Sequence, residues 1–371
     1  MIDARIADDV SLTGFIGERM VMQAASGAGK SYGIRKILEA SHGQLQHIVL
    51  DVEDEFFTLR EAFDYALIGG DGADVPLPTA DPAGLATQLL ELQASAIIQL
   101  NDLEWADQCD FVHRFITGLM SAPKRLWHPA LVVVDEAQRF APQSGKEQST
   151  RALKSLATQG RKRGFSAIFA TQRISDLDKN IVGQCQNRVI GRADQALDRN
   201  TAADLLGFTK QSNDAKALMS LDAGQMWFVG KSLSMQPVLS RFLPCQTTHI
   251  EPGRSGAIPK PPAPETIVKM LAALAEKKPE EPAASDQVVP VPVRRADAVP
   301  LERHKSEVAD AERRGFARGL AAGEAQGRRE VEDAIRLALD GLTPARTVTV
   351  QIVPDTESPE PVTREPSPPT R

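Results

Sequence analysis

Residues 24–31 read AASGAGKS and approach the phosphate-binding pattern GxxxxGK[S/T]. In that pattern, backbone N–H groups wrap the phosphates, the lysine reaches the β- and γ-phosphates, and the hydroxyl ligates Mg²⁺. Ala24 stands where the pattern begins with glycine, and alanine is the smallest residue with a Cβ. The alternative is a chance turn of small residues. We predict nucleotide contacts from Ala25, Ser26, Gly27, Ala28, Gly29, Lys30, Ser31 and Tyr32, with Ser31 also a Mg²⁺ ligand.

A second acidic element follows the apolar run of LVVVDE, residues 131–136. Asp135 is predicted to hold the Mg²⁺ shell, and Glu136 to orient and polarise the attacking water. Alone, this run could be a buried strand that ends in solvated acids. Together with the phosphate-binding loop, it predicts hydrolysis of ATP with Mg²⁺ as cofactor.

Short apolar runs alternate with helical segments through the first two thirds of the chain, and one such run precedes the glycine-rich loop. Strands that alternate with helices predict a mostly parallel central sheet flanked by helices, which together with the glycine-rich loop is an α/β fold of the P-loop NTPase type. Ligands of such sheets bind beyond the carboxyl ends of the strands. The strand candidates are ERMVMQAA, LQHIVLDV, ASAIIQL, PALVVVDE, FSAIFATQ and NRVIGR.

Composition changes near residue 250, because 17 of the 25 prolines follow Glu251 while all Trp and Tyr precede it. A segment so poor in aromatic residues cannot bury enough surface to offset its ordering entropy. We predict an ATPase domain over 1–250, a Pro-rich linker over 251–300 and a disordered tail over 341–371. Between them, 301–340 is predicted to be a helix for oligomerisation or partner binding, since its glycines recur every four residues at 315, 319, 323 and 327.

The net charge is −6 and the pI about 5.7, which excludes a generally basic protein that coats nucleic acid. The three cysteines show no CxxC spacing, so neither a zinc site nor a disulfide scaffold is expected. No apolar run approaches the roughly 20 residues of a membrane span. The N-terminus lacks the basic and apolar regions of a signal peptide. A cytoplasmic protein without membrane contact is therefore expected.

Beyond Asp135 and Glu136 the chain continues with AQRFAPQ, GRKRG and IFATQRISDLDKNIVGQCQNRVIGR. In these motifs, from the phosphate-binding loop to about residue 243, the sequence resembles the HerA branch of the HerA/FtsK superfamily of ring-forming ATPases. The resemblance implies that Gln172 of ATQR is a sensor near the γ-phosphate. It also places Asp51 of HIVLDVEDEF as an acidic active-site residue, with Glu55 as its weaker companion.

GRKRG resembles the segment that carries an arginine finger into the neighbouring subunit's site, with Arg161 the first choice and Arg163 the second. Three consecutive cations that end a helix could also complement its macrodipole. Gln172 could simply hydrogen-bond a loop. LDAGQMWFVG resembles the closing strand, in which Gly224 makes a turn. Archaeal HerA-type proteins carry a β-barrel before the loop, whereas 23 residues precede Ala24, so we expect a ring without that barrel or a second chain that replaces it.

The resemblance implies a homo-oligomer, most simply a hexamer, that translocates double-stranded DNA with helicase-type activity beside a protein partner such as a nuclease. Lys146, Arg151 and Lys154 could face a DNA channel, and PKRLWHP (123–129) is a second pore-loop candidate. Each could equally be a solvated surface. The alternative function is a nucleotide-gated assembly switch that recruits a partner through the C-terminal helix without moving DNA.

Overall fold

The structure is a computed structural model that describes residues 3–145 and 147–249. The predicted linker, glycine-repeat helix and tail lie outside the described residues, as does Lys146. Within 3–145 and 147–249, no helix is long and apolar enough to cross a lipid bilayer.

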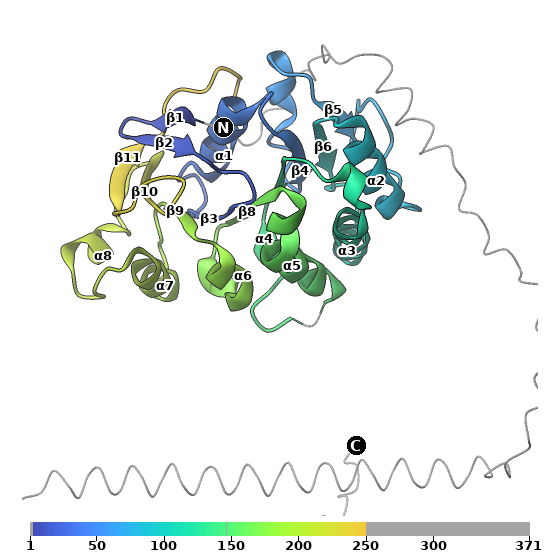
Figure 1. The fold of residues 1–371 in the computed structure, drawn as a ribbon. Helices are drawn as coiled ribbons and strands as arrows, with labels where there is room; N and C mark the ends of the chain where they lie inside the picture. The colour runs from blue at the N-terminus through green and yellow to red at the C-terminus, as the bar shows by residue number, and fades with distance from the viewer. Residues whose placement is uncertain (1–2, 146, 250–371) are drawn as a thin grey trace, which may run out of the picture. The chain divides into compact units, whose positions relative to one another are not determined.

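The described part of the chain is built on one large sheet with the strand order β11-β10-β9-β3-β8-β7-β4-β6-β5 (Figure 1). The seven strands from β9 to β5 run parallel, and β10 and β11 are antiparallel additions at one edge. This confirms the predicted α/β fold with a mostly parallel sheet. The strands of the large sheet are β3 (Arg19–Gln23), β4 (Gln46–Asp51), β5 (Ala66–Ile68), β6 (Ala96–Gln99), β7 (Ala130–Val134), β8 (Phe165–Thr171), β9 (Asn187–Ile190), β10 (Gln225–Val229) and β11 (Val238–Arg241).

The six apolar runs correspond to β3, β4, β6, β7, β8 and β9, and the expected closing strands are β10 and β11. Sequence reasoning missed an N-terminal hairpin, β1 (Asp3–Ala7) and β2 (Val10–Thr13), and the three-residue strand β5. β5 is too short to show a hydrophobic period of its own. The hairpin strands mix polar and apolar residues, and they pair with each other rather than within the large sheet.

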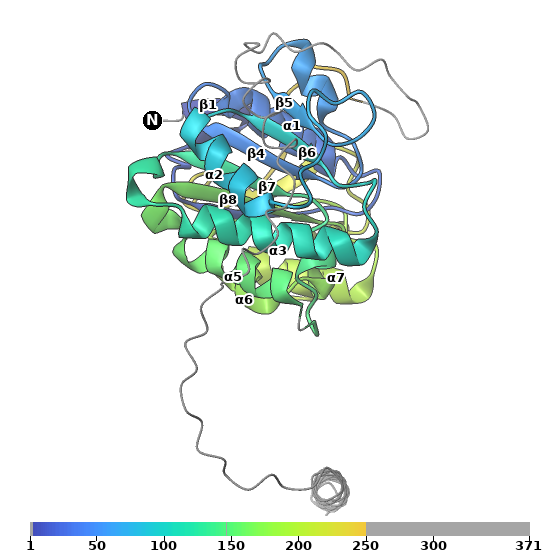
Figure 2. The same ribbon diagram turned by 90° about the vertical axis from the view of Figure 1, so that its right-hand side faces the viewer.

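Helices cover both faces of the sheet, as Figure 2 shows from the side. Strand β7 illustrates why: Ala130, Val132 and Val134 face one hydrophobic cluster, whereas Leu131 and Val133 face the other. Successive side chains of a strand point to opposite faces, so a wholly apolar strand requires cover on both. The helices are α1 (Lys30–Ser41), α2 (Pro82–Leu92), α3 (Trp105–Ser121), α4 (Ala137–Phe140), α5 (Gln148–Gln159), α6 (Lys179–Gln184), α7 (Ala196–Leu206) and α8 (Asn213–Ala217), with 3₁₀ turns η1 (Phe57–Glu61), η2 (Lys124–Leu126), η3 (Gly160–Arg163) and η4 (Ile174–Asp176).

The order of the central strands positions the site. β8 lies between β3, which leads into the glycine-rich loop, and β7, which is followed by Asp135 and Glu136. Because these strands are parallel, their carboxyl ends meet at one edge of the sheet. The residue that follows β8, Gln172, therefore lies between the loop and the acidic pair.

The last described segment, 244–249, packs against α1. The carboxylate of Glu39 accepts hydrogen bonds from the backbone N–H groups of Gln246 (2.9 Å) and Thr247 (2.9 Å) and from the Thr247 hydroxyl (2.8 Å). Arg35, which is fully buried, donates from Nη1 to Thr247 Oγ1 at 3.0 Å. Helix α1, which begins at the glycine-rich loop, is thus hydrogen-bonded through Arg35 and Glu39 to a segment more than 200 residues away in sequence.

We expect Glu39→Gln to lower the free energy of unfolding by about 2–3 kcal/mol, because a buried amide cannot accept all the hydrogen bonds that the carboxylate accepts. Denaturant unfolding monitored by circular dichroism measures this change. Glu91→Gln is the matched control, since Glu91 forms an exposed ion pair with Arg125 that contributes at most about 1 kcal/mol. Equal stability of the two variants would contradict a structural role for Glu39.

Candidate active site

The glycine-rich loop connects β3 to α1 with two glycines in the left-handed region, Gly27 (φ 70°) and Gly29 (φ 96°). A Cβ on Gly29 would lie 2.9 Å from the backbone nitrogen of Gly224, too close for any side chain. Gly224 itself has φ 79° and donates its N–H to the Ala28 carbonyl at 3.0 Å. The Gly224 turn therefore supports the loop from the side of β10.

Ala24, the departure from the usual pattern, is fully buried and is not among the described non-glycine residues with positive φ. Its N–H donates to the Thr171 carbonyl at 3.3 Å, which continues the pairing of β3 with β8. A Cβ added to Gly191 would lie 2.9 Å from the Ala24 methyl group. The room for the extra methyl group comes from a glycine that follows the neighbouring strand β9.

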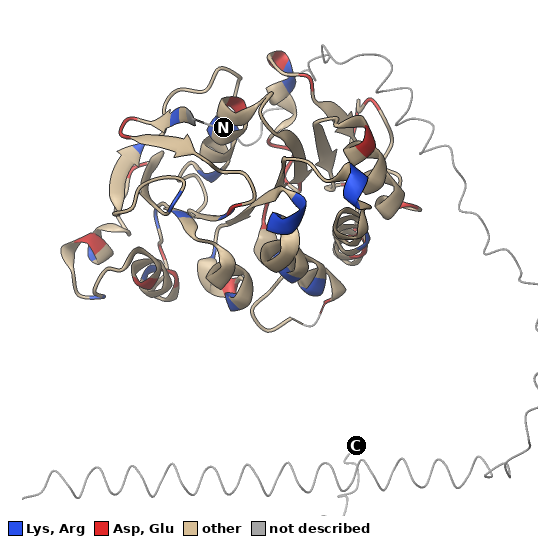
Figure 3. Cartoon of the chain, viewed as in Figure 1, with Lys and Arg blue, Asp and Glu red and all other residues tan. Residues whose placement is uncertain are grey.

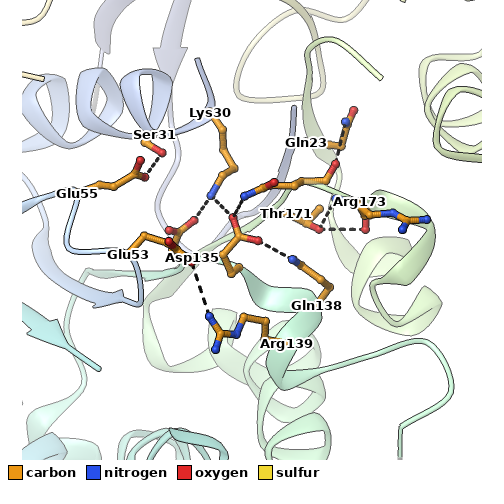
Figure 4. Close-up of polar contacts among 12 residues, drawn as sticks. Gln23, Lys30, Ser31, Glu53, Glu55, Asp135, Gln138, Arg139, Thr171 and Arg173 are labelled. Atoms are coloured by element: carbon orange, nitrogen blue, oxygen red, sulfur yellow. Dashed lines mark hydrogen bonds and ion pairs between the residues drawn. The ribbon is translucent and has the colours of Figure 1, made fainter. Parts of the chain in front are cut away.

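The buried ammonium of Lys30 lies between the carboxylates of Asp135 and Glu136 (Figure 4). It forms ion pairs with Asp135 Oδ1 and, at 2.6 Å, with Glu136 Oε1. Burial alone would lower the pKa of Lys30, but the two carboxylates outweigh it and raise the pKa. Burial raises the pKa of Asp135 to about 6, although the charge of Lys30 opposes this shift. Lys30 therefore stays protonated and positively charged at the carboxyl ends of the strands.

Glu136 occupies a strained position two residues beyond the end of β7. Its backbone is left-handed, with φ 46° and ψ 45°, which costs a non-glycine residue on the order of 1–3 kcal/mol. Its carboxylate accepts hydrogen bonds from Gln138 Nε2 (2.5 Å) and Gln172 Nε2 (3.0 Å). Burial raises the pKa of Glu136, but Lys30 and the two amides outweigh it, so the pKa is lowered and the carboxylate stays charged. The structure thus brings together Lys30, Asp135, Glu136 and Gln172.

The resemblance implied that Asp51 is the acidic active-site residue and Glu55 its weaker companion. In the structure it is Glu55 that contacts the glycine-rich loop. The carboxylate of Glu55 accepts a hydrogen bond from the Ser31 hydroxyl. Asp51 is fully buried, and its carboxylate accepts from the backbone N–H groups of Glu55 (3.2 Å) and Phe56 (3.0 Å). Burial and then the charge of Asp135 raise the pKa of Asp51 to about 8. Asp51 holds the turn that brings Glu55 to the loop.

The donor set suits Mg²⁺. The Ser31 hydroxyl and the Asp135 carboxylate supply oxygen, and Oδ2 of Asp135 is buried without a hydrogen-bond partner among the described residues. No group of three or more His, Cys, Asp or Glu side chains able to hold a metal occurs in 3–145 and 147–249. Mg²⁺ is commonly held by one or two carboxylates together with substrate phosphates, so a full protein cage is not required.

Two further residues border the loop. Tyr32, predicted to contact nucleotide, accepts a hydrogen bond on its hydroxyl from the Cys245 N–H at 3.0 Å, and its ring meets His249 edge-on. Its hydroxyl is thus engaged by the segment that covers α1. Arg192, which sequence reasoning missed, donates from Nη2 to the Ser26 carbonyl at 3.1 Å. Only the pairing of β9 with β3 brings Arg192 there, so no local motif could have identified it.

Arg161 and Arg163 lie at the amino end of β8, whereas Lys30 lies beyond the carboxyl ends of the parallel strands. β8 has seven residues, and a strand rises about 3.3 Å per residue, so the separation is roughly 20 Å. The structure therefore does not bring either arginine to the nucleotide loop of its own chain. Among the DNA-channel candidates, Lys154 pairs with Asp178 at 2.8 Å, while Arg151 is exposed.

Comparisons with known proteins find similarity over part of the chain. The family described as Zonular occludens toxin (Zot) matches residues 86–204. The "DNA double-strand break repair helicase HerA" of Pyrococcus furiosus is 29% identical over 134 residues, which are 36% of this chain and 24% of that protein. Its Saccharolobus solfataricus counterpart is 28% identical over 112 residues, 30% of this chain and 22% of that protein. Over these segments the chain is distantly similar to the HerA helicases. It matches less than a quarter of the length of these two relatives.

Solved structures of similar shape include the bacterial conjugative coupling protein TrwB, with a TM-score of 0.49, 10% identity, and coverage of 68% of this chain and 91% of that one. VirB4 of Thermoanaerobacter pseudethanolicus has a TM-score of 0.46 at 14% identity, with 62% of this chain and 90% of that one covered.

We expect Gly191→Ala to weaken binding of an ATP analogue and to lower the free energy of unfolding by about 1–3 kcal/mol, the usual cost of overpacking. The added Cβ would lie 2.9 Å from the Ala24 methyl group and 2.5 Å from Met226 Sδ. Titration with a fluorescent, non-hydrolysable ATP analogue measures the affinity.

Gly183→Ala is the matched control, because a Cβ on this α6 glycine meets no atom within 4 Å. Ala24→Gly in the Gly191→Ala background should recover part of the loss, since it removes one of the two contacts. Equal losses in the single and double variants would contradict the contact between Ala24 and Gly191.

Proposed function

We propose that the site catalyses Mg²⁺-dependent hydrolysis of ATP. The observation that carries the proposal is the charged carboxylate of Glu136, held at a strained strand end by Lys30, Gln138 and Gln172. A carboxylate fixed in this way can orient and polarise a water molecule for attack on a phosphate. The partial similarity to DNA double-strand break repair helicases supports the same class of reaction.

Each residue has a distinct role in this proposal. The N–H groups of residues 25–32 wrap the phosphates, and the Lys30 ammonium passes from the carboxylates to the phosphate oxygens. Ser31 and Asp135 would hold a Mg²⁺ ion, which would neutralise charge on the phosphates. Once Lys30 leaves Glu136, that carboxylate is free to accept a hydrogen bond from the water, while Gln172 senses the γ-phosphate. Asp51 acts by holding the turn that carries Glu55.

We further propose that the protein works as a homo-oligomeric ring, most simply a hexamer, that translocates double-stranded DNA beside a protein partner such as a nuclease. Arg161 lies at the sheet edge remote from Lys30, so an arginine finger here must act on the site of a neighbouring subunit. Sequence similarity to HerA helicases supports DNA as the polymer that the ring translocates. The switch alternative depends on the glycine-repeat segment, which lies outside the described residues.

Glu136→Gln should retain ATP binding while hydrolysis falls by about 10²–10⁴-fold, the usual contribution of a positioned base. The amide keeps the size of the side chain but cannot accept a proton. Steady-state phosphate release and analogue titration measure the two properties. Glu53→Gln is the control, because that half-exposed acid pairs with Arg139 at 3.7 Å and not with Lys30. Unchanged turnover in Glu136→Gln would remove this residue from the reaction.

Double-stranded DNA should stimulate ATP hydrolysis, and the stimulation should fall steeply between 50 and 200 mM salt. A protein that contacts several phosphates loses about 10³–10⁵-fold in affinity over this range through counterion release. Phosphate release with and without a linear duplex measures the effect. If the rate of hydrolysis is the same with and without DNA at every salt concentration but changes with a protein partner, the motor hypothesis is contradicted and the switch is favoured.

A further inference from the structure

Two basic motifs that are separate in the sequence meet at the amino ends of β7 and β8. They are the finger motif in η3 with Gly164, and the loop 123–129 that contains η2; Figure 3 shows both turns as blue segments. Gly164 has φ 83°, and a Cβ there would lie 2.8 Å from the carbonyl oxygen of His128. The Ala130 N–H donates to the Gly164 carbonyl at 3.3 Å. The two segments are therefore in backbone contact.

The contact involves Arg163 and leaves Arg161 free. The guanidinium of Arg163 lies 5.2 Å from the centroid of the Trp127 ring, and its Nη1 donates to the Gln159 carbonyl at 3.4 Å. The indole is itself fixed, because Trp127 Nε1 donates to the Ala122 carbonyl at 2.8 Å. Arg161 is exposed, and its guanidinium has neither a hydrogen bond nor an ion pair with any residue of 3–145 or 147–249.

The stem of Arg161 lies against the loop between β2 and β3. A Cβ on Gly17 would lie 3.1 Å from Cγ of Arg161 and 3.5 Å from its Cα. This loop is held by Ser166, whose hydroxyl accepts from the Gly17 N–H at 2.9 Å and donates to the Phe15 carbonyl at 2.6 Å. The turn that carries Arg161 is thus bounded by Trp127 on one side and by Gly17 on the other.

We propose that Arg161 is the finger and that Trp127 and Arg163 are positioning residues that set the direction in which Arg161 leaves the turn. This inference rests on the proposed ring ATPase and identifies which arginine acts there and what orients it. A free arginine side chain loses rotamer entropy when it is fixed in one direction. A misplacement of about 1 Å can cost 10²-fold in rate. A rigid turn reduces both costs before the neighbouring nucleotide arrives.

The test is subunit mixing with the full chain. The reference pair is Arg161→Ala, which has an intact nucleotide loop, mixed with Lys30→Ala, which has an intact finger. Each variant alone should be inactive, and the mixture should regain activity because some interfaces pair an intact loop with an intact finger. Failure of this reference pair to regain activity would overturn the trans-acting finger of the proposed function itself.

Trp127→Leu and Arg163→Leu alone should each lower kcat about tenfold or more while KM for ATP changes less than about twofold, since their own nucleotide loops are intact. Mixed with Lys30→Ala, each should regain activity, whereas mixed with Arg161→Ala each should stay low. A fold defect would not be repaired by a neighbour in this way. Lys210→Leu is the control, because Lys210 is an exposed cation that pairs with Asp204 at 3.7 Å and belongs to neither basic motif; it should keep full activity.

With a working reference pair, unchanged kcat in both Trp127→Leu and Arg163→Leu would overturn the positioning role. So would a loss of activity that Lys30→Ala subunits do not restore. Arg163→Lys should retain more activity than Arg163→Leu, since an ammonium can still lie over the indole ring. Equal losses in the Lys and Leu variants would show that the cation–π contact does not orient the finger.

Discussion

The buried ammonium of Lys30 between two carboxylates is the interaction on which the site depends. Removing these charges from water costs several kcal/mol per ion unless each is paired and hydrogen-bonded. Asp135 and Glu136 must therefore meet Lys30 at the same edge of the sheet, which the parallel strands β3 and β7 achieve. The strained backbone of Glu136 is maintained by the same contacts, together with the amides of Gln138 and Gln172.

Strand β8 joins the two ends of the proposed mechanism. Its carboxyl end leads to Gln172, which contacts Glu136, and its amino end follows the turn that carries Arg161. A fully buried, seven-residue strand in the centre of a sheet is one of the more rigid elements of a domain. In the proposed mechanism, a displacement of Gln172 at the γ-phosphate would therefore be transmitted along β8 to the turn that carries Arg161 of the same subunit.

Sequence reasoning predicted the α/β fold, the central strands and the loop, because each rests on a local pattern. It missed β5, which is stable only as an addition to β6, and the hairpin β1–β2, which pairs within itself. It ranked Asp51 above Glu55, whereas the structure directs Asp51 to backbone N–H groups and Glu55 to Ser31. Which of two nearby acids reaches the loop depends on how the turn 51–56 bends, and spacing along the chain does not contain that information.

The sequence by itself determined the fold class and the chemical types at the site, because hydrophobic period, glycine spacing and acids after an apolar run are local properties. The sequence motifs also indicated a resemblance to the HerA helicases, and the chain is 29% identical to one of them over 134 residues. Only the tertiary structure decided how Ala24 is accommodated, through Gly191 beside it, and which arginine is free, through the stacking of Arg163 on Trp127. The physical reason is the same in both cases: steric room and side-chain contacts arise between segments that the sheet brings together from distant parts of the chain.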